Sequence, residues 1–138
     1  EKTQIQQFIS LQKKKKIFFH GMMNRNDLHK KISELDVALV PLKTRIYGSV
    51  PSKIFEYSTL GFPILYFGGG EGETIVKENS LGWVAEVKNY NDLKEKLKCI
   101  AQFSKTELQE MRNTVFKTSN LAFNLNQQIE NLIGENVF

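Results

Sequence analysis

The sequence predicts an α/β fold in which a parallel β-sheet carries helices on both faces. Short apolar runs rich in β-branched and aromatic residues alternate with longer segments whose apolar residues recur at helical spacing. Strands that alternate with helices pair in parallel, because each helix returns the chain to the same end of the sheet. With 138 residues, 41% of them hydrophobic, the chain is large enough for one domain with its own core.

Four apolar runs are predicted to be strands. Their apolar residues follow one another with little polar interruption, as in strands that are buried on both faces of a sheet. The predicted strands cover residues 16–21, 36–42, 63–70 and 82–87, of which the last is the weakest.

Amphipathic segments between and after these runs are predicted to be helices. They cover residues 25–35, 51–60, 72–79 and 91–102, followed by two C-terminal helices within 104–134, the second from Asn120. Ser104 suits the N-cap of the first C-terminal helix, because its hydroxyl can accept a hydrogen bond from the first turn. The chain opens on a polar, helix-like segment, so we expect residues 1–138 to be a single truncated domain that lacks its first strand and helix.

Composition and charge exclude several classes of protein. The net charge of +4 at pH 7 allows an anionic partner but does not identify one. A single cysteine, Cys99, excludes an intrachain disulfide and fits a reducing compartment. No apolar stretch approaches the roughly 20 residues of a membrane span. The basic run at 13–16 has no interleaved aromatic residues to stack on bases, so we expect no nucleic acid partner.

The start of the helix predicted at 51–60 has features that suit an anion. Pro51 fits the first helical position, since it has no N–H to leave unpaired, and Val50 then becomes the N-cap. Valine has no side-chain oxygen, so the backbone N–H groups of Ser52 and Lys53 lack an obvious partner. The helix dipole disfavours the Lys53 cation by roughly a few tenths of a kcal/mol. A diphosphate bound to these N–H groups, the Ser52 hydroxyl and the Lys53 ammonium would reverse that effect.

Glu56 lies one turn beyond Lys53 on the same face of the predicted helix. A carboxylate about a turn beyond a phosphate site is well placed to accept hydrogen bonds from both hydroxyls of a ribose. The alternative is an ordinary helix start with a Lys53–Glu56 surface pair, and the spacing alone favours neither interpretation.

The glycines at 68–70 carry a less specific signal. They do not form the G-x-G-x-x-G pattern of dinucleotide-binding loops, and Glu71 and Glu73 would repel a pyrophosphate. The glycines would let the backbone approach a neutral, hydroxyl-rich group, with Glu73 accepting a hydrogen bond from it. A plain turn before the helix predicted at 72–79 is the favoured alternative.

Taken together, these segments resemble the C-terminal, donor-binding domain of the retaining GT-B glycosyltransferases of the group 1, or family 4, type. The resemblance rests on the order and spacing of "KIFFHGMMNRNDLHKKISELDVALVPL", "VPSKIFEYSTLGFPIL" and "GGGEGETIVKENSLGWVAEV". The second of these matches the family's signature helix, and Glu56 matches the second glutamate of its E-x7-E motif. The resemblance implies a Rossmann-like sheet that forms the C-terminal half of a GT-B fold.

The resemblance also implies a binding site for a nucleoside diphosphate sugar, built from three parts of the chain. The matched residues are Val50, Ser52 and Lys53 for the diphosphate, Glu56 for the ribose, Gly21, Met22 and Met23 for the base, and Gly69, Gly70 and Glu73 for the donor sugar. It implies neither a metal nor a cofactor, and no catalytic set is complete in this chain.

One position departs from the family's pattern and leaves the donor sugar in doubt. The first glutamate of the motif should lie eight residues before Glu56, where this sequence has Gly48. The "SVPSK" version resembles a branch that builds bacterial surface polysaccharides by transfer to a saccharide or lipid-linked acceptor.

The resemblance implies a metal-independent retaining enzyme in the cytoplasm, with the inner face of the plasma membrane as a place for peripheral attachment of the full enzyme. Its partner would be the N-terminal acceptor domain of the same enzyme. That domain is not in this chain, so we expect the chain alone to be inactive.

Two other functions are alternatives. A nucleotide-sugar 2-epimerase resembles this scaffold, but it needs acid–base carboxylates and histidines around the sugar, and the sequence offers few. A receiver-like signalling module needs an acidic cluster at the carboxyl ends of strands, whereas Asp36 lies at the start of one. Binding of a nucleoside diphosphate, but not of acetyl phosphate or a metal, would distinguish the glycosyltransferase from the signalling module.

Overall fold

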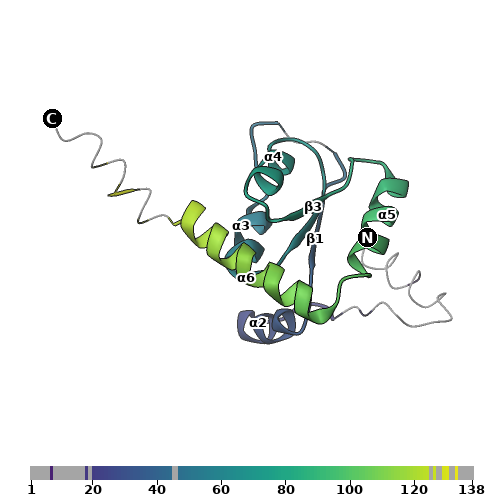
Figure 1. Cartoon of the computed structure of the whole chain (residues 1–138), viewed down its shortest axis with the longest axis horizontal. Coiled ribbons are helices and arrows are strands. Elements are labelled where there is room, and N and C mark those ends of the chain that lie inside the picture. The colour runs from purple at the N-terminus through teal and green to yellow at the C-terminus, as the bar shows by residue number, and fades with distance from the viewer. Residues whose placement is uncertain are drawn as a thin grey trace. The chain divides into compact units, whose positions relative to one another are not determined.

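The structure, a computed structural model, describes residues 7, 18, 20–44, 47–124, 126, 129–130 and 133 (Figure 1). The chain divides into two compact units, residues 1–34 and 35–138, and each unit is described by itself.

The first unit contains helix α2 (Arg25–Ser33), which confirms the helix predicted at 25–35. The helix begins where the Asn24 side chain accepts a hydrogen bond of 2.9 Å from the backbone N–H of Asp27. Lys31, in the last turn, lies 2.5 Å from the Glu34 carboxylate, and this contact lowers the pKa of Glu34. Residues 16, 17 and 19 of the strand predicted at 16–21 lie outside the described residues, and Phe18, His20 and Gly21 are described without a strand assignment.

The second unit is built on a parallel sheet, as predicted. Its described strands are β1 (Ala38–Pro41), β2 (Ile64–Phe67) and β3 (Gly82–Val84), each shorter than its predicted range. The strand β2 lies between the other two, with Ile64 opposite Ala38 on one side and Gly82 on the other. The loops that follow β1 and β2 therefore leave the sheet at the same edge, at the carboxyl ends of the strands.

Both faces of this sheet are buried. Side chains alternate along a strand, so Ile64 and Tyr66 point to one face of β2 and Leu65 and Phe67 to the other. All four are buried. This pattern explains why the strand reads as a continuous apolar run in the sequence.

Helices cover the two faces unequally (Figure 1). The residues Ile54, Val76 and Val115 pack with Ile64 and Tyr66 on one face, whereas Ile100 packs with Leu65 and Phe67 on the other. The helices that supply these contacts are α3 (Ser52–Thr59), α4 (Glu71–Glu78) and α6 (Lys105–Ala122) on the first face and α5 (Tyr90–Ile100) on the second. The second unit is therefore an α/β, Rossmann-like layer structure.

The C-terminal helix α6 begins as predicted, at Ser104. The Ser104 hydroxyl accepts from the Glu107 backbone N–H at 3.2 Å, while the Glu107 carboxylate accepts from the Ser104 hydroxyl and N–H. These bonds lower the pKa of Glu107. The helix continues through Asn120 to Ala122, so the predicted boundary between two helices before Asn120 is wrong. Within the second predicted helix, residues 125, 127–128 and 131–132 lie outside the described residues.

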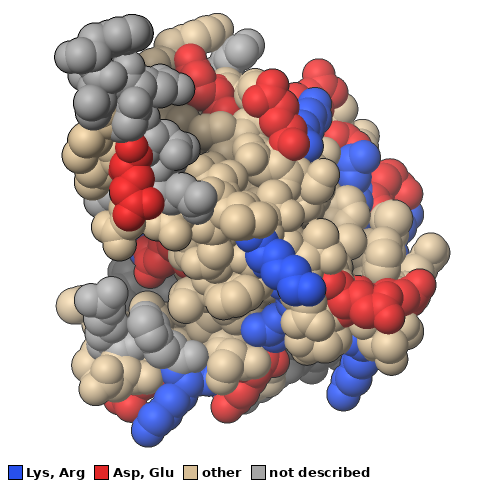
Figure 2. Space-filling view, turned by 60° about the vertical axis from the view of Figure 1, so that its left-hand side comes forward, with Lys and Arg blue, Asp and Glu red and all other residues tan. Residues whose placement is uncertain are grey.

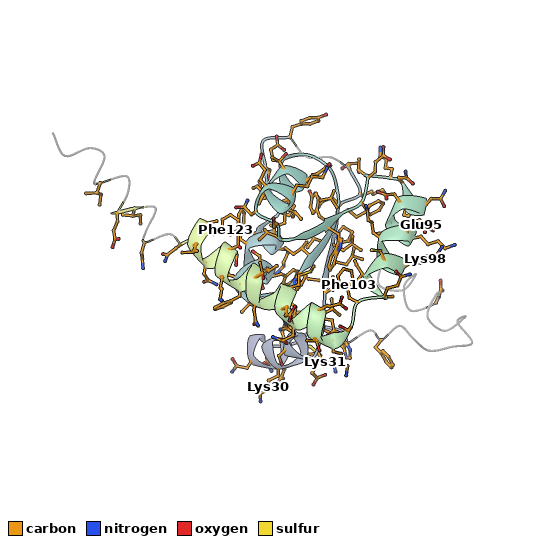
Figure 3. The ribbon with its side chains drawn as sticks, in the orientation of Figure 1. Lys30, Lys31, Glu95, Lys98, Phe103 and Phe123 are labelled. Carbon is orange, nitrogen blue, oxygen red and sulfur yellow. The ribbon has the colours of Figure 1, made fainter. Side chains whose placement is uncertain are left out.

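Helix α6 is joined to α3 by polar and aromatic contacts. The buried Ser119 hydroxyl donates to the Ser58 carbonyl at 2.7 Å. Phe123, at the end of α6, packs edge-on against Phe55 of α3 with 4.9 Å between ring centroids (Figure 3). Helix α6 thus holds α3 at Phe55 and Ser58.

The surface mixes both charges. On the face seen in Figure 2, basic and acidic side chains are interspersed rather than gathered into a patch of one sign. None of the described helices combines the length and the apolar character that a bilayer crossing requires.

Candidate functional site

The first turn of α3 has no side-chain cap. Pro51 is the N-cap, with φ −60° and ψ 121°, and the helix begins at Ser52. The prediction that Val50 is the N-cap and Pro51 the first helical residue is therefore wrong by one position, because the Pro51 backbone is still extended. Val50 packs instead against the core of the second unit, which leaves its backbone as the part able to reach a ligand.

The backbone donors at this helix start are available as predicted. The N–H of Ile54 donates to the Pro51 carbonyl at 3.0 Å. Among the residues that the structure describes, the N–H groups of Ser52 and Lys53 have no such partner. Both residues are exposed, so two donors and the positive end of the helix dipole face solvent.

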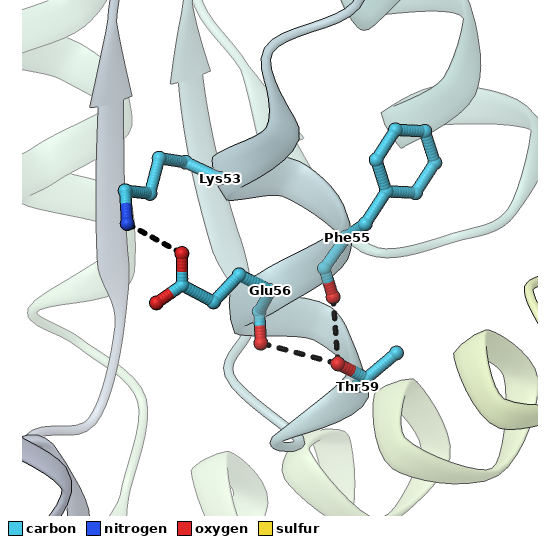
Figure 4. A network of polar contacts seen from close by, with 4 residues as sticks. All are labelled: Lys53, Phe55, Glu56 and Thr59. Atoms are coloured by element: carbon cyan, nitrogen blue, oxygen red, sulfur yellow. Dashed lines mark hydrogen bonds and ion pairs between the residues drawn. The ribbon is translucent and has the colours of Figure 1, made fainter. Parts of the chain in front are cut away.

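Lys53 and Glu56 form an ion pair with each other (Figure 4). The side chains are 51% and 39% exposed, and the hydrogen bond to Glu56 raises the pKa of Lys53. The Lys53 ammonium also lies 5.6 Å from the centroid of the Tyr57 ring. The surface pair that was the alternative interpretation is thus present. An exposed pair of this kind contributes only about 0–1 kcal/mol, so a stronger ligand can replace it.

The loop between β2 and α4 is built from glycines with left-handed backbone. Gly69 and Gly70 have φ of 65° and 74°, and Gly70 is the N-cap of α4. The Gly70 carbonyl accepts from the Glu73 N–H at 3.0 Å, which closes the first turn of the helix. The Glu73 carboxylate accepts from Lys77 at 2.6 Å, so it too has a partner before any ligand binds.

One contact joins this loop to the segment ahead of α3, and the sequence did not predict it. The backbone N–H of Gly48 donates to the Glu71 carboxylate at 3.0 Å. Gly48 stands where the E-x7-E motif has its first glutamate, so a carboxylate from the first residue of α4 reaches this place. The only sequence signal for the contact is the parallel sheet, which brings the loops after β1 and β2 to one edge.

The residues predicted to contact the base belong to the first unit. Gly21 has φ of 72°, Met22 is 96% exposed, and Met23 is 36% exposed. They precede α2 and present backbone groups and two flexible thioether side chains to solvent.

The described residues contain no group of three or more His, Cys, Asp or Glu side chains placed to hold a metal ion. At the start of α3, exposed Ser52 and Lys53 offer backbone N–H groups and an ammonium that could bind an anion, and the Glu56 carboxylate could accept hydrogen bonds from hydroxyl groups. In a parallel α/β sheet, ligands bind at the carboxyl ends of the strands, the edge where these loops lie.

A model of the family described as glycosyl transferases group 1 matches residues 1–118. The chain belongs to this family. No curated protein and no solved structure gives a significant match. The matched range includes every residue predicted for the donor site, from Gly21 to Glu73.

Membership of the group 1 glycosyltransferases assigns the chain a role in glycosyl transfer. The family also agrees with the Rossmann-like architecture of the second unit. The uncapped start of α3 and the glycine loop before α4 both lie within residues 1–118, the part of the chain that the family model matches.

Proposed function

We propose that this chain binds a nucleoside diphosphate sugar as the donor-binding part of a glycosyltransferase. The observation that carries the proposal is the start of α3, where the N–H groups of Ser52 and Lys53 have no partner in the described part of the chain. A diphosphate placed there would accept from both groups and gain from the helix dipole. The Ser52 hydroxyl and the Lys53 ammonium would complete the site.

Binding would exchange the partners of the Lys53–Glu56 pair. The diphosphate would bind the Lys53 ammonium, because Lys53 lies about one turn nearer the helix start than Glu56 does. Glu56 would then be released to accept hydrogen bonds from the two ribose hydroxyls. A charged partner makes each of these bonds stronger than a bond between neutral groups.

The sugar of the donor would extend from this point toward the glycine loop that precedes α4. Gly69, Gly70 and Glu73 would face the sugar, where Glu73 would leave Lys77 to accept from a hydroxyl. Gly21, Met22 and Met23 would contact the base, and the Val50 backbone would border the diphosphate.

In the reaction, the sugar would pass to a saccharide or lipid-linked acceptor in surface polysaccharide synthesis. The contribution of this chain is electrostatic, because Lys53 and the helix dipole neutralise the diphosphate as it leaves. We propose a retaining, metal-independent reaction with an N-terminal acceptor domain as partner, at the cytoplasmic face of the membrane.

Calorimetric titration tests the binding step directly. The chain is titrated with UDP, ADP and GDP and with the matching nucleosides. We expect one diphosphate to bind at least about tenfold more tightly than its nucleoside, because the phosphate contacts are charge-assisted. Equal affinity for a diphosphate and its nucleoside, or no binding of any diphosphate, would contradict the proposal.

A further inference from the structure

The central strand carries a buried tyrosine that has no role in the site described above. Tyr66 is fully buried, with 0% of its surface exposed, and its ring packs among the residues between the sheet and α3 and α4. Its hydroxyl donates to the Gly69 carbonyl at 2.9 Å. The carbonyl lies three positions after the tyrosine, so the hydroxyl acts on the turn through which the chain leaves β2.

The glycine loop is closely packed around this hydroxyl. A Cβ added to Gly72 would lie 2.6 Å from the Tyr66 oxygen, and one added to Gly68 would lie 2.9 Å from it. Both distances are shorter than a van der Waals contact, so the loop can take this path only with glycine at these positions. The backbone at Gly68 and Gly72 is therefore packed closely against the Tyr66 hydroxyl.

The environment of the hydroxyl keeps it a donor. Burial raises the pKa of Tyr66, and the nearby carboxylates of Glu73 and Glu71 raise it further. The protonated hydroxyl can therefore hold the Gly69 carbonyl over the whole physiological pH range. The pair of glycines with positive φ, Gly69 and Gly70, leads from this carbonyl directly into the first turn of α4.

We propose that Tyr66 is a positioning residue for the donor sugar: its hydroxyl fixes the loop 68–72 and thereby the place of the Glu73 carboxylate relative to the start of α3. This inference rests on the proposed function, since it assumes that the sugar of a nucleoside diphosphate sugar faces this loop. The Gly48–Glu71 hydrogen bond ties the other side of the loop to the segment ahead of α3. Tyr66 and Glu71 together hold the loop between the sheet and the diphosphate site.

The substitution Tyr66→Phe tests this role, because it removes one oxygen and leaves the ring that fills the core. The matched control is Tyr90→Phe, the same change at a side chain that is 73% exposed. Both variants and the parent chain are titrated with UDP-glucose, ADP-glucose and GDP-mannose and with UDP, ADP and GDP. Hydrogen exchange of the amides at 69–73 is measured without ligand.

For Tyr66→Phe we expect the affinity for the nucleotide sugar that binds the parent to fall about five- to tenfold, the effect of one lost hydrogen bond. The affinity for the matching diphosphate should change by less than about twofold. Amide exchange at 69–73 should become faster while exchange in α5 is unchanged, and Tyr90→Phe should change none of these values. If Tyr66 had only a structural role, the substitution would lower the affinities for the nucleotide sugar and for the diphosphate equally.

The two proposals fail in different ways. If the parent binds the diphosphate and the nucleotide sugar, but Tyr66→Phe weakens both equally or neither, the positioning role is refuted and the proposed function stands. Unchanged exchange at 69–73 would also refute the positioning role, whether or not any ligand binds. If the parent binds none of the six nucleotides, the proposed function is refuted and the sugar-side role of Tyr66 with it.

Discussion

Lys53 occupies the first turn of α3, where the helix dipole disfavours its charge, while Glu56 and the Tyr57 ring partly offset that cost. In the free chain, Lys53→Ala should therefore change the free energy of unfolding by less than about 0.5 kcal/mol. In the complex it should weaken a nucleoside diphosphate about ten- to a hundredfold, since a charge-assisted bond to phosphate is lost. Thermal melts and titrations with the diphosphate and its nucleoside measure both effects.

Two lysines provide controls for this variant. Lys31 makes the same i to i+3 pair with Glu34, but in the last turn of α2, where the dipole favours a cation. Lys31→Ala should therefore destabilise the chain slightly more than Lys53→Ala. Lys98, paired with Glu95 in α5, lies outside the proposed site, so Lys98→Ala should leave binding unchanged (Figure 3). If Lys53→Ala melts well below the parent and still binds the diphosphate normally, Lys53 is only a structural partner of Glu56.

Glu56→Gln keeps the shape of the side chain and removes the charge that would accept from the ribose. We expect it to weaken the binding of a ribonucleoside diphosphate by about 1.5–3 kcal/mol, because hydrogen bonds to a charged group are lost. The 2′-deoxy analogue should lose clearly less binding free energy, since one of its two ribose hydroxyls is already absent. Calorimetry with both ligands measures the difference, and equal losses would remove Glu56 from the ribose site.

At the scale of elements, the pairing of β2 with β3 depends on one glycine. A Cβ on Gly82 would lie 2.2 Å from the Ile64 carbonyl oxygen, and the φ of Gly82 is 144°. Gly82→Ala should therefore lower the free energy of unfolding by about 3 kcal/mol. Gly48→Ala is the control: its φ is 70° but its Cβ would meet nothing within 4 Å, so only backbone strain of about 1 kcal/mol is expected. Similar costs in denaturant titrations would show that the contact with Ile64 is relieved by a small shift.

The start of α6 should make stability depend on pH in a predictable direction. Because the pKa of Glu107 is lowered in the folded chain, the carboxylate stabilises the fold fully above its ordinary pKa. That contribution is lost as the pH falls through the lowered value. Ser104→Ala removes the two hydrogen bonds of the Ser104 hydroxyl but keeps the backbone N–H bond to the Glu107 carboxylate, and at pH 7 it should cost about 1 kcal/mol.

Denaturant titrations of the parent and Ser104→Ala from pH 7 down to pH 3 test this dependence. The difference in unfolding free energy between the two chains should shrink as the pH falls, because protonation weakens the same contact in the parent. A difference that stays constant with pH would show that the Ser104 hydroxyl does not bond to the Glu107 carboxylate.

The elements that the sequence predicted best are those whose ends are decided by local chemistry. The helix predicted at 72–79 is α4 at Glu71–Glu78, and Ser104 caps α6 as expected. Strand β3 is shorter than its predicted range because, after Ala85, the Glu86 N–H donates to the Asp92 side chain at 2.7 Å instead of to a strand. The apolar pattern cannot reveal such a competing partner.

At the scale of the whole molecule, the last described helix supports the helix that carries the proposed site. The Ser119 hydroxyl of α6 holds the buried Ser58 carbonyl of α3 at 2.7 Å. Ser119→Ala should lower the free energy of unfolding by about 1 kcal/mol, because the carbonyl loses its buried donor. Thr114→Ala is the control, since its hydroxyl bonds only within α6 and alanine favours a helix. Equal melting temperatures for the two variants would contradict this link between α6 and α3.

The contacts that complete the candidate site could not be predicted from the sequence, because they join residues that are far apart along the chain. The free donors of Ser52 and Lys53 follow from local rules, apart from the shift of the N-cap to Pro51. The bond between Gly48 and Glu71 spans 23 positions and depends on the register of β1 and β2. The alternatives for Lys53 and Glu56 could not be separated by spacing, because both place the two residues on one helix face.

The pair of Lys53 and Glu56 has a consequence for which molecules the site would admit. Glu56 is paired with Lys53, so a phosphate bound at the proposed site would have to displace the glutamate from the lysine. Free diphosphate would bind the lysine but leave the glutamate without a partner. A bare nucleoside could donate to the glutamate only if the glutamate gave up its bond to the lysine. A molecule that carries an anion and a diol one helical turn apart satisfies both at once. Competition within the protein would thus favour an intact nucleotide over free diphosphate or a bare nucleoside.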